Sequence, residues 1–103
     1  MRIEGEWEVA IKTPIGTLTV EYVFDRHSGA LAGRATYRGE TVVLQDITSG
    51  AGADGTRLRW RQSVTKPMRL NLAFDVVVEG DVMTGHSRAG RLPRSVVTGH
   101  RRV

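Results

Sequence analysis

Residues 57–64 read Arg-Leu-Arg-Trp-Arg-Gln-Ser-Val, and this stretch decides the fold. Leucine, tryptophan, glutamine and valine occupy every second position, with three arginines and a serine between them. A β-strand sends successive side chains to opposite faces, so this alternation is typical of a strand with one buried and one solvated face. We therefore expect a strand here, with Trp60 and Gln62 on its inner face.

The same alternation recurs on both sides of this stretch. Glycine, proline or acidic turn residues separate the runs, as in successive hairpins, and helical spacing never persists. The glycine-rich residues 49–55 are expected to form a loop between two strands. The alternation predicts eight strands, at residues 5–13, 17–25, 30–38, 41–48, 57–64, 68–78, 82–89 and 92–103.

A chain of 103 residues has room for one core, so residues 1–103 are expected to form a single domain. Strands joined in sequence can form an open meander, a sandwich or a closed up-and-down barrel. Closure removes both exposed sheet edges and brings acidic residues of the first strand opposite basic residues of the last. We therefore predict an all-β fold, an eight-stranded antiparallel up-and-down β-barrel closed by its first and eighth strands. The complementary residues are Glu4, Glu6 and Glu8, and Arg94, His100 and Arg102.

The predicted interior is aromatic. All six aromatic side chains fall on the apolar faces of their runs, and Gly33 falls on the same face, where it is expected to leave space. An eight-stranded barrel is either filled by side chains or holds one small ligand. Small-molecule sites combine apolar walls with a few polar groups, so the inward polar tips favour a ligand. The predicted ligand-binding residues are Tyr22, Tyr37, Trp60, Gln62, Phe74 and Met83.

The fourth run leaves two registers open. One brings Gln45 into the lumen together with Val43, and the other brings in Asp46 together with Leu44. An inward Asp46 would offer a carboxyl with a raised pKa for acid–base chemistry. Gln45 is preferred because burying an unpaired aspartate is costly.

The seventh run also allows two registers. Ser87 faces inward if the register runs through Met83 and Gly85. A shift by one residue would instead turn His86 into the lumen, as a group that titrates near neutral pH. The small and apolar residues on the first face favour Ser87.

The two ends of the chain carry a resemblance to known families. Gly5 and Trp7 form a Gly-x-Trp pair in the first run, and Arg101 lies near the end of the last. These residues resemble the signature shared by the lipocalin, fatty-acid-binding and avidin families, collectively the calycins. In calycins the tryptophan closes one end of the barrel and the late arginine packs across it. The resemblance implies small-molecule binding in the lumen and a structural, barrel-closing role for Trp7 and Arg101.

The chain departs from these families in some respects. It is shorter than a lipocalin, lacks the C-terminal helix of that family, and is nearer the avidins in size. It shows no biotin-site pattern, so biotin binding is not carried over from the resemblance.

The charge is basic, with a formal net charge of +4 at pH 7 and an outward stripe of Arg57, Arg59 and Arg61. Basic surfaces favour anionic partners. A nucleic-acid groove would also present exposed aromatic rings for stacking, and the rings here are assigned inward, so we do not expect a nucleic acid. Assembly or anionic-partner binding through this arginine-rich outer face is a minor alternative, and a homo-oligomer stays open.

No metal or cofactor is expected. The chain has no cysteine, and its three histidines lack ligand-like spacing. Residues 50–55 match the spacing of a dinucleotide fingerprint, but a strand is expected after them where that site needs a helix. No charged-then-apolar leader and no long apolar run occurs, which predicts a cytoplasmic protein without a membrane segment.

The leading functional expectation is a β-barrel that binds a small apolar molecule in an aromatic-lined lumen. The alternative is a cofactor-independent enzyme, a cyclase or isomerase, that acts on an apolar substrate in the same lumen by positioning and one hydrogen-bond donor. Both hypotheses require the same lining, so the sequence assigns no catalytic residue.

Overall fold

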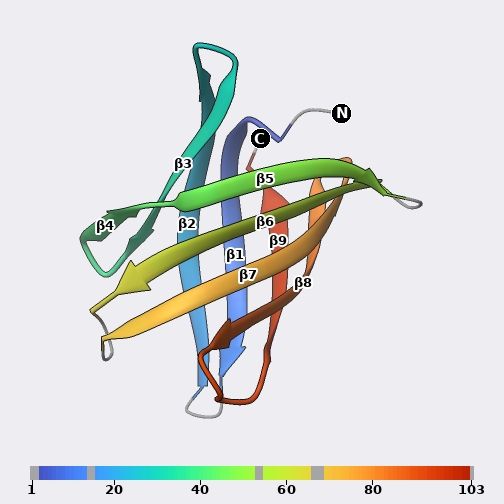
Figure 1. Ribbon diagram of the computed structural model, residues 1–103. Coiled ribbons are helices and arrows are strands. Elements are labelled where there is room, and N and C mark those ends of the chain that lie inside the picture. The colour runs from blue at the N-terminus through green and yellow to red at the C-terminus, as the bar shows by residue number, and fades with distance from the viewer. Residues whose placement is uncertain (1–2, 14–15, 53–54, 66–68, 103) are drawn as a thin grey trace.

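The computed structural model describes residues 3–13, 16–52, 55–65 and 69–102 (Figure 1). These residues form strands and no helix, so none of them builds a helix that could span a membrane. Met68, where the sixth run was expected to begin, lies outside the described residues. The strands are β1 (Gly5–Thr13), β2 (Gly16–His27), β3 (Ala30–Tyr37), β4 (Glu40–Val43), β5 (Gln45–Gly52), β6 (Gly55–Val64), β7 (Leu70–Glu79), β8 (Val82–Ala89) and β9 (Ser95–Arg101).

The strands form one antiparallel sheet in the order β4-β3-β2-β1-β9-β8-β7-β6-β5. In Figure 1, β5, β6 and β7 pass at a steep angle in front of β2, β1 and β9, so the sheet rolls around one interior. The predicted all-β, antiparallel, up-and-down architecture is confirmed as a nearly closed barrel.

The pairing of the first and last strands is also confirmed. Trp7 on β1 pairs with Arg101 on β9. On the outer surface, the Arg102 guanidinium lies 3.3 Å from the Glu8 carboxylate and 2.8 Å from that of Glu21 on β2. Exposed ion pairs of this kind support the register without driving the fold.

The barrel has nine strands and an unsealed seam between its two edge strands, β4 and β5. The prediction of eight strands closed by the first and the eighth is therefore wrong. The predicted fourth run divides into β4 and β5. Asp46 adopts a left-handed φ of 52°, and the pairing of β5 with β6 shifts between Gln45 and Thr48. A bulge of this kind bends the chain. As a result β4 pairs with β3, β5 pairs with β6, and β4 and β5 become the two edges of the sheet.

The same bulge overturns the preference for an inward Gln45. Leu44 is buried and Val42 packs against the core, whereas Val43 is 73% exposed. The register through Val42 and Leu44 is therefore the observed one. It ends at the bulge, which leaves both Gln45 and Asp46 exposed to solvent.

The expected loop at residues 49–55 is also wrong in its extent. Strand β5 continues to Gly52 and β6 begins at Gly55, and these two glycines pair with each other. Gly50 pairs with Arg57 in the same ladder. Pairing with the strongly alternating β6 overrides the weak strand preference of this glycine-rich stretch.

Aromatic rings fill the middle of the barrel. The rings of Trp60 and Phe74 stack with centroids 4.7 Å apart and planes 8° from parallel. Tyr22 and Phe24 meet the Trp60 ring edge-on, with centroids at 5.4 Å and 5.6 Å. Both geometries suit the quadrupoles of the rings. This layer of rings lies between the two ends of the barrel interior.

Side chains bridge the seam near one of these ends. The Glu40 carboxylate accepts a hydrogen bond from the Thr65 backbone N–H at 3.3 Å and a second one from the Thr65 hydroxyl. Glu40 begins β4 and Thr65 follows β6, so these contacts join the two sides of the seam.

Candidate functional site

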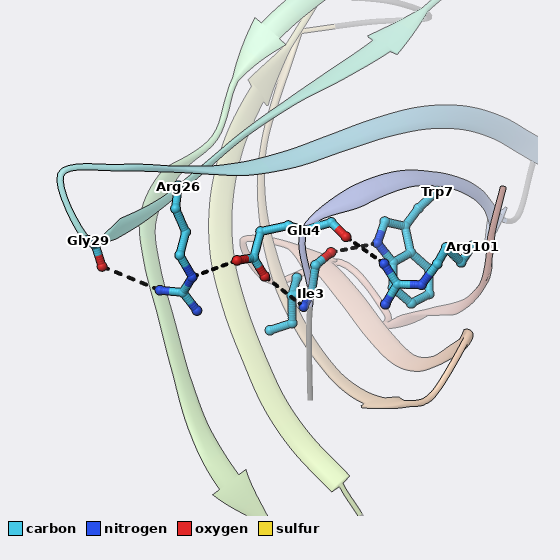
Figure 2. Close-up of polar contacts among 6 residues, drawn as sticks. All are labelled: Ile3, Glu4, Trp7, Arg26, Gly29 and Arg101. Carbon is cyan, nitrogen blue, oxygen red and sulfur yellow. Dashed lines mark hydrogen bonds and ion pairs between the residues drawn. The ribbon is translucent and has the colours of Figure 1, made fainter. Parts of the chain in front are cut away.

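One end of the barrel is sealed by Trp7. The indole is fully buried and donates a hydrogen bond from Nε1 to the Ile3 carbonyl oxygen at 2.9 Å. Arg101 covers the ring, with Cζ 4.5 Å from the ring centroid (Figure 2). A guanidinium over an indole face gains cation–π attraction and excludes water.

Arg101 is held in place by the backbone around it. Its guanidinium donates from Nη1 to the Glu4 carbonyl oxygen at 2.6 Å and from Nε to the Asp81 carboxylate at 2.8 Å. Gly5 explains the Gly-x-Trp spacing, because its φ is +130° and a Cβ at this position would lie 3.0 Å from Arg101 Nη1. A side chain there would strain the backbone and push the guanidinium off the ring.

Glu4 completes the sealed end. Its carboxylate accepts a hydrogen bond from Arg26 Nε at 2.8 Å, as Figure 2 shows. Hydrogen bonds from its own backbone N–H and from Arg26 hold the pKa of Glu4 below its usual range.

Gly33 does not leave the space that the sequence suggested, and the inward Gly85 leaves none either. A Cβ at Gly33 would lie 2.9 Å from both Leu44 Cδ1 and Phe24 Cδ1, so side chains from other parts of the chain already occupy that position. A Cβ at Gly85 would lie 2.2 Å from the Asp75 carbonyl oxygen. These glycines permit close packing and do not form a cavity.

The cavity lies at the other end, between the aromatic layer and the turns that join β3 to β4 and β8 to β9. Its volume is about 240 Å³, slightly below the usual range of roughly 300 to 1,000 Å³ for small-molecule sites. Most of the wall is apolar, and the polar groups are few. The apolar lining residues are Ile11, Leu18, Val20, Ala35, Val42, Val64, Leu70, Leu72, Ala89, Leu92 and Pro93, and the polar ones are Thr13, Tyr37, Glu40, Gln62, Ser87 and Ser95.

Two of the six predicted ligand-binding residues line this cavity. They are Tyr37, at its mouth, and Gln62, at its inner wall. The other four are buried in the core and are not among the described lining residues of this cavity. These four are Tyr22, Trp60, Phe74 and Met83.

Sequence reasoning missed most of the lining, although a signal for it was present. Ile11 lies on the same face of β1 as Trp7 and four residues further along the strand. Leu18 pairs with Ile11 in the next strand, and Leu70 and Leu72 begin β7 at the same end. Inward positions far from Trp7 along each strand mark the open end.

Gln62 is the polar centre of the inner wall. Its side-chain oxygen accepts hydrogen bonds from the Tyr22 hydroxyl at 2.7 Å and from Trp60 Nε1 at 2.9 Å. Burial raises the pKa of Tyr22 far above its usual range, so the phenol stays protonated as a donor. The amide therefore satisfies two buried donors of the aromatic layer and touches the cavity as well.

Ser87 is the second polar group of the inner wall. The preferred register of the seventh run is confirmed, because Ser87 is 3% exposed and His86 points to solvent. Ser87 lies on β8 opposite Phe74, while Gln62 lies on β6 opposite Leu72. The two polar groups thus flank β7 on either side.

Charged groups are scarce around the cavity. Glu40 is the single Asp, Glu, Lys, Arg or His among the described lining residues, and Thr65 donates a hydrogen bond to its carboxylate at the mouth. Within the described part of the chain, no group of three or more His, Cys, Asp or Glu side chains is placed to hold a metal ion.

The outward arginine stripe is largely ion-paired. Arg57 donates two hydrogen bonds to the Asp75 carboxylate, at 3.0 Å and 2.6 Å, and Arg59 lies 3.4 Å from it. The hydrogen bond from Arg57 holds the pKa of Asp75 below its usual range. Arg61 lies 3.7 Å from the Asp46 carboxylate. Part of the positive charge of this face is therefore neutralised locally.

No family model, curated protein or solved structure matches this chain. The function is therefore inferred from the cavity and the residues around it, since a barrel fold by itself hosts many functions.

Proposed function

We propose that this protein is a small-molecule-binding β-barrel whose ligand occupies the apolar cavity opposite Trp7. The observation that carries the proposal is the asymmetry of the interior. Hydrogen bonds and cation–π packing seal one end, and aromatic rings fill the middle. The other end keeps about 240 Å³ of space. Protein interiors are otherwise packed without voids of this size.

The walls support a mainly hydrophobic ligand. Leu70 and Leu72 from β7 face Ile11, Leu18 and Val42 from the opposite side of the barrel. Burial of apolar ligand surface contributes roughly 25 cal/mol per Å², so a molecule of modest size gains useful affinity from these walls alone. The calycin resemblance and the cytoplasmic location expected from the sequence are part of the same proposal.

Binding is favoured over a cyclase or isomerase activity by the chemistry of the inner wall. Gln62 offers an amide and Ser87 a hydroxyl, and neither group titrates near neutral pH. The carboxylate that lines the cavity, Glu40, lies at the mouth and is bound to Thr65. Orientation of a ligand is the role that these groups fit.

The test is a titration with N-phenyl-1-naphthylamine, a neutral dye that becomes brighter in apolar surroundings. We expect saturable binding of one dye per chain. Ala89→Leu should weaken binding at least tenfold, because Ala89 lines the cavity and a leucine there fills it. Ala73→Leu is the matched control, since Ala73 on the neighbouring strand is exposed. Absence of saturable binding, or equal effects of the two variants, would refute the proposal.

A further inference from the structure

The orientation of the Gln62 amide is fixed by its neighbours. Trp60 Nε1 carries a hydrogen and can only donate, so the Gln62 atom 2.9 Å from it must be the oxygen. The Tyr22 hydroxyl donates to the same oxygen at 2.7 Å. A rotated amide would set its N–H groups against the indole N–H, leaving two donors face to face in a buried place. The amino group therefore points away from the aromatic layer.

This amino group is presented to the cavity. Among the residues that the structure describes, Gln62 Nε2 has no hydrogen-bond partner, yet no fully buried side-chain nitrogen or oxygen is left unpaired. Gln62 is 3% exposed and lines the cavity, so we infer that its small accessible surface faces that space. Its two N–H bonds are thus donors at the inner end of an apolar space, where an acceptor oxygen would satisfy one of them.

Ser87 adds a second group of the same kind. Its hydroxyl has no partner within the described residues, and its side chain lines the cavity from the other side of β7. A hydroxyl can donate as well as accept, so it can share a ligand oxygen with the amide of Gln62.

The charges around the cavity select against anions. The described lining residues include no lysine, arginine or histidine, whereas Glu40 places a carboxylate at the mouth. A ligand carboxylate inside would lose its water without gaining a cation from the described lining residues.

We propose that the ligand is a neutral, largely apolar molecule that carries a carbonyl oxygen, such as a ketone, lactone or ester, which accepts a hydrogen bond from Gln62 Nε2 with Ser87 as a second contact. This inference rests on the proposed binding function and specifies what the same cavity recognises. The apolar part lies against the leucines of β7 and the carbonyl faces the inner wall.

Three probes of one shape test it: 1-tetralone, tetralin, and 1,2,3,4-tetrahydro-1-naphthoate. Titration calorimetry on the full chain gives the affinity of each. Gln62→Met keeps the length of the side chain and removes the donor. We expect Gln62→Met to lower the affinity for 1-tetralone about tenfold, which is the effect of one buried hydrogen bond. The affinity for tetralin should change less than about twofold. In the unaltered protein the naphthoate should bind at least tenfold more weakly than 1-tetralone.

Gln62→Met also leaves the Tyr22 and Trp60 donors unpaired and could disturb the fold, so two further measurements serve as controls. Ser87→Ala should lower the affinity for 1-tetralone two- to fivefold and leave the affinity for tetralin unchanged. In the unaltered protein, the amide protons of the Gln62 side chain should shift in NMR spectra with 1-tetralone and hardly move with tetralin.

The outcomes separate the two proposals. The carbonyl inference is overturned, while the binding function stands, if both neutral probes bind and Gln62→Met lowers their affinities equally. The same holds if the Gln62 amide protons do not shift with 1-tetralone. If the naphthoate binds as tightly as 1-tetralone, the requirement for a neutral ligand is overturned. If none of the probes binds the unaltered protein, the binding function fails and the inference with it.

Discussion

The two ends of this barrel are built from the same strands but treat their polar groups in opposite ways. At the sealed end, the Trp7 and Arg101 donors bind backbone carbonyl oxygens of Ile3 and Glu4. At the open end, the donor of Gln62 faces an unfilled space. Buried donors that are paired within the chain stabilise the fold, whereas donors that face a cavity are available to a ligand. The contacts that stabilise the fold and the binding site that we propose thus lie at opposite ends of one sheet.

The largest expected effect concerns the sealed end. Trp7→Ala removes a fully buried indole and its bond to Ile3, which should lower the free energy of unfolding by about 3 to 5 kcal/mol. Urea denaturation followed by circular dichroism measures it. Leu92→Ala at the open end is the control, and it should cost less than about 1 kcal/mol because Leu92 is exposed. An unchanged midpoint for Trp7→Ala would remove the distinction between the ends.

The second prediction concerns the boundary between the aromatic layer and the cavity. Gln62→Leu leaves the Tyr22 hydroxyl and the Trp60 N–H unpaired, which should lower the free energy of unfolding by about 2 to 3 kcal/mol. Adding Tyr22→Phe removes one of the two unpaired donors, so it should restore part of the lost free energy of unfolding. Denaturation of the double variant measures the recovery, and a purely additive result would contradict the shared hydrogen-bond network.

The third prediction uses alkaline pH. In the unfolded chain Tyr22 ionises near pH 10, whereas in the folded protein burial keeps its pKa far higher. The folded state then holds a proton that the unfolded state has lost, so stability is fully present below pH 10 and falls as the pH rises above it. The loss should approach about 1.4 kcal/mol per pH unit. Denaturation at pH 9 to 11.5 should show this slope, and Tyr22→Phe should abolish it.

The fourth prediction compares ligand binding with stability at the open end. Ala89→Leu places extra methyl groups into unfilled space, so the free energy of unfolding should change by no more than about 1 kcal/mol. The same variant should lose dye binding, as described above. A large loss of stability would mean that this end is packed as tightly as the Trp7 end.

The smallest effect concerns Glu4 at the sealed end. Arg26→Gln removes one of the hydrogen bonds that hold the pKa of Glu4 down, so the pKa should rise toward its ordinary value. The contribution from its own backbone N–H should persist, which limits the rise. An NMR titration of the Glu4 carboxyl measures it, with Glu79 as an untouched reference, and no change would assign the shift to the backbone alone.

The strand positions could be predicted from the sequence because alternation is a local property. Residues 57–64 and their neighbours show this clearly, and the pairing of the first and last strands followed from their charges. The division at Leu44 could not be predicted, since the left-handed Asp46 depends on how β5 pairs with β6. The inward faces of most strands were equally accessible to sequence reasoning.

The cavity was predictable only in part. Sequence reasoning assigned the space to Gly33, but whether a glycine leaves a void depends on which distant side chains reach it. Leu44 and Phe24 do so here. The role of Gln62 as a polar interior residue was accessible from its place in the alternation. The direction of its amide was not, because it depends on the contact with the Trp60 N–H and on the Tyr22 hydroxyl, forty residues away in the chain.

The seam between β4 and β5 has a mechanical consequence. In a continuous ladder, the circumference of a barrel is fixed by backbone hydrogen bonds along every strand boundary. Here one boundary lacks a ladder, and Glu40 and Val42 on its β4 side line the cavity. Widening the mouth therefore requires breaking the contacts between Glu40 and Thr65 and leaves the backbone pairing of the other strands intact. We therefore expect the open end to widen more easily than the Trp7 end, and under the proposed function its width limits the size of the ligand.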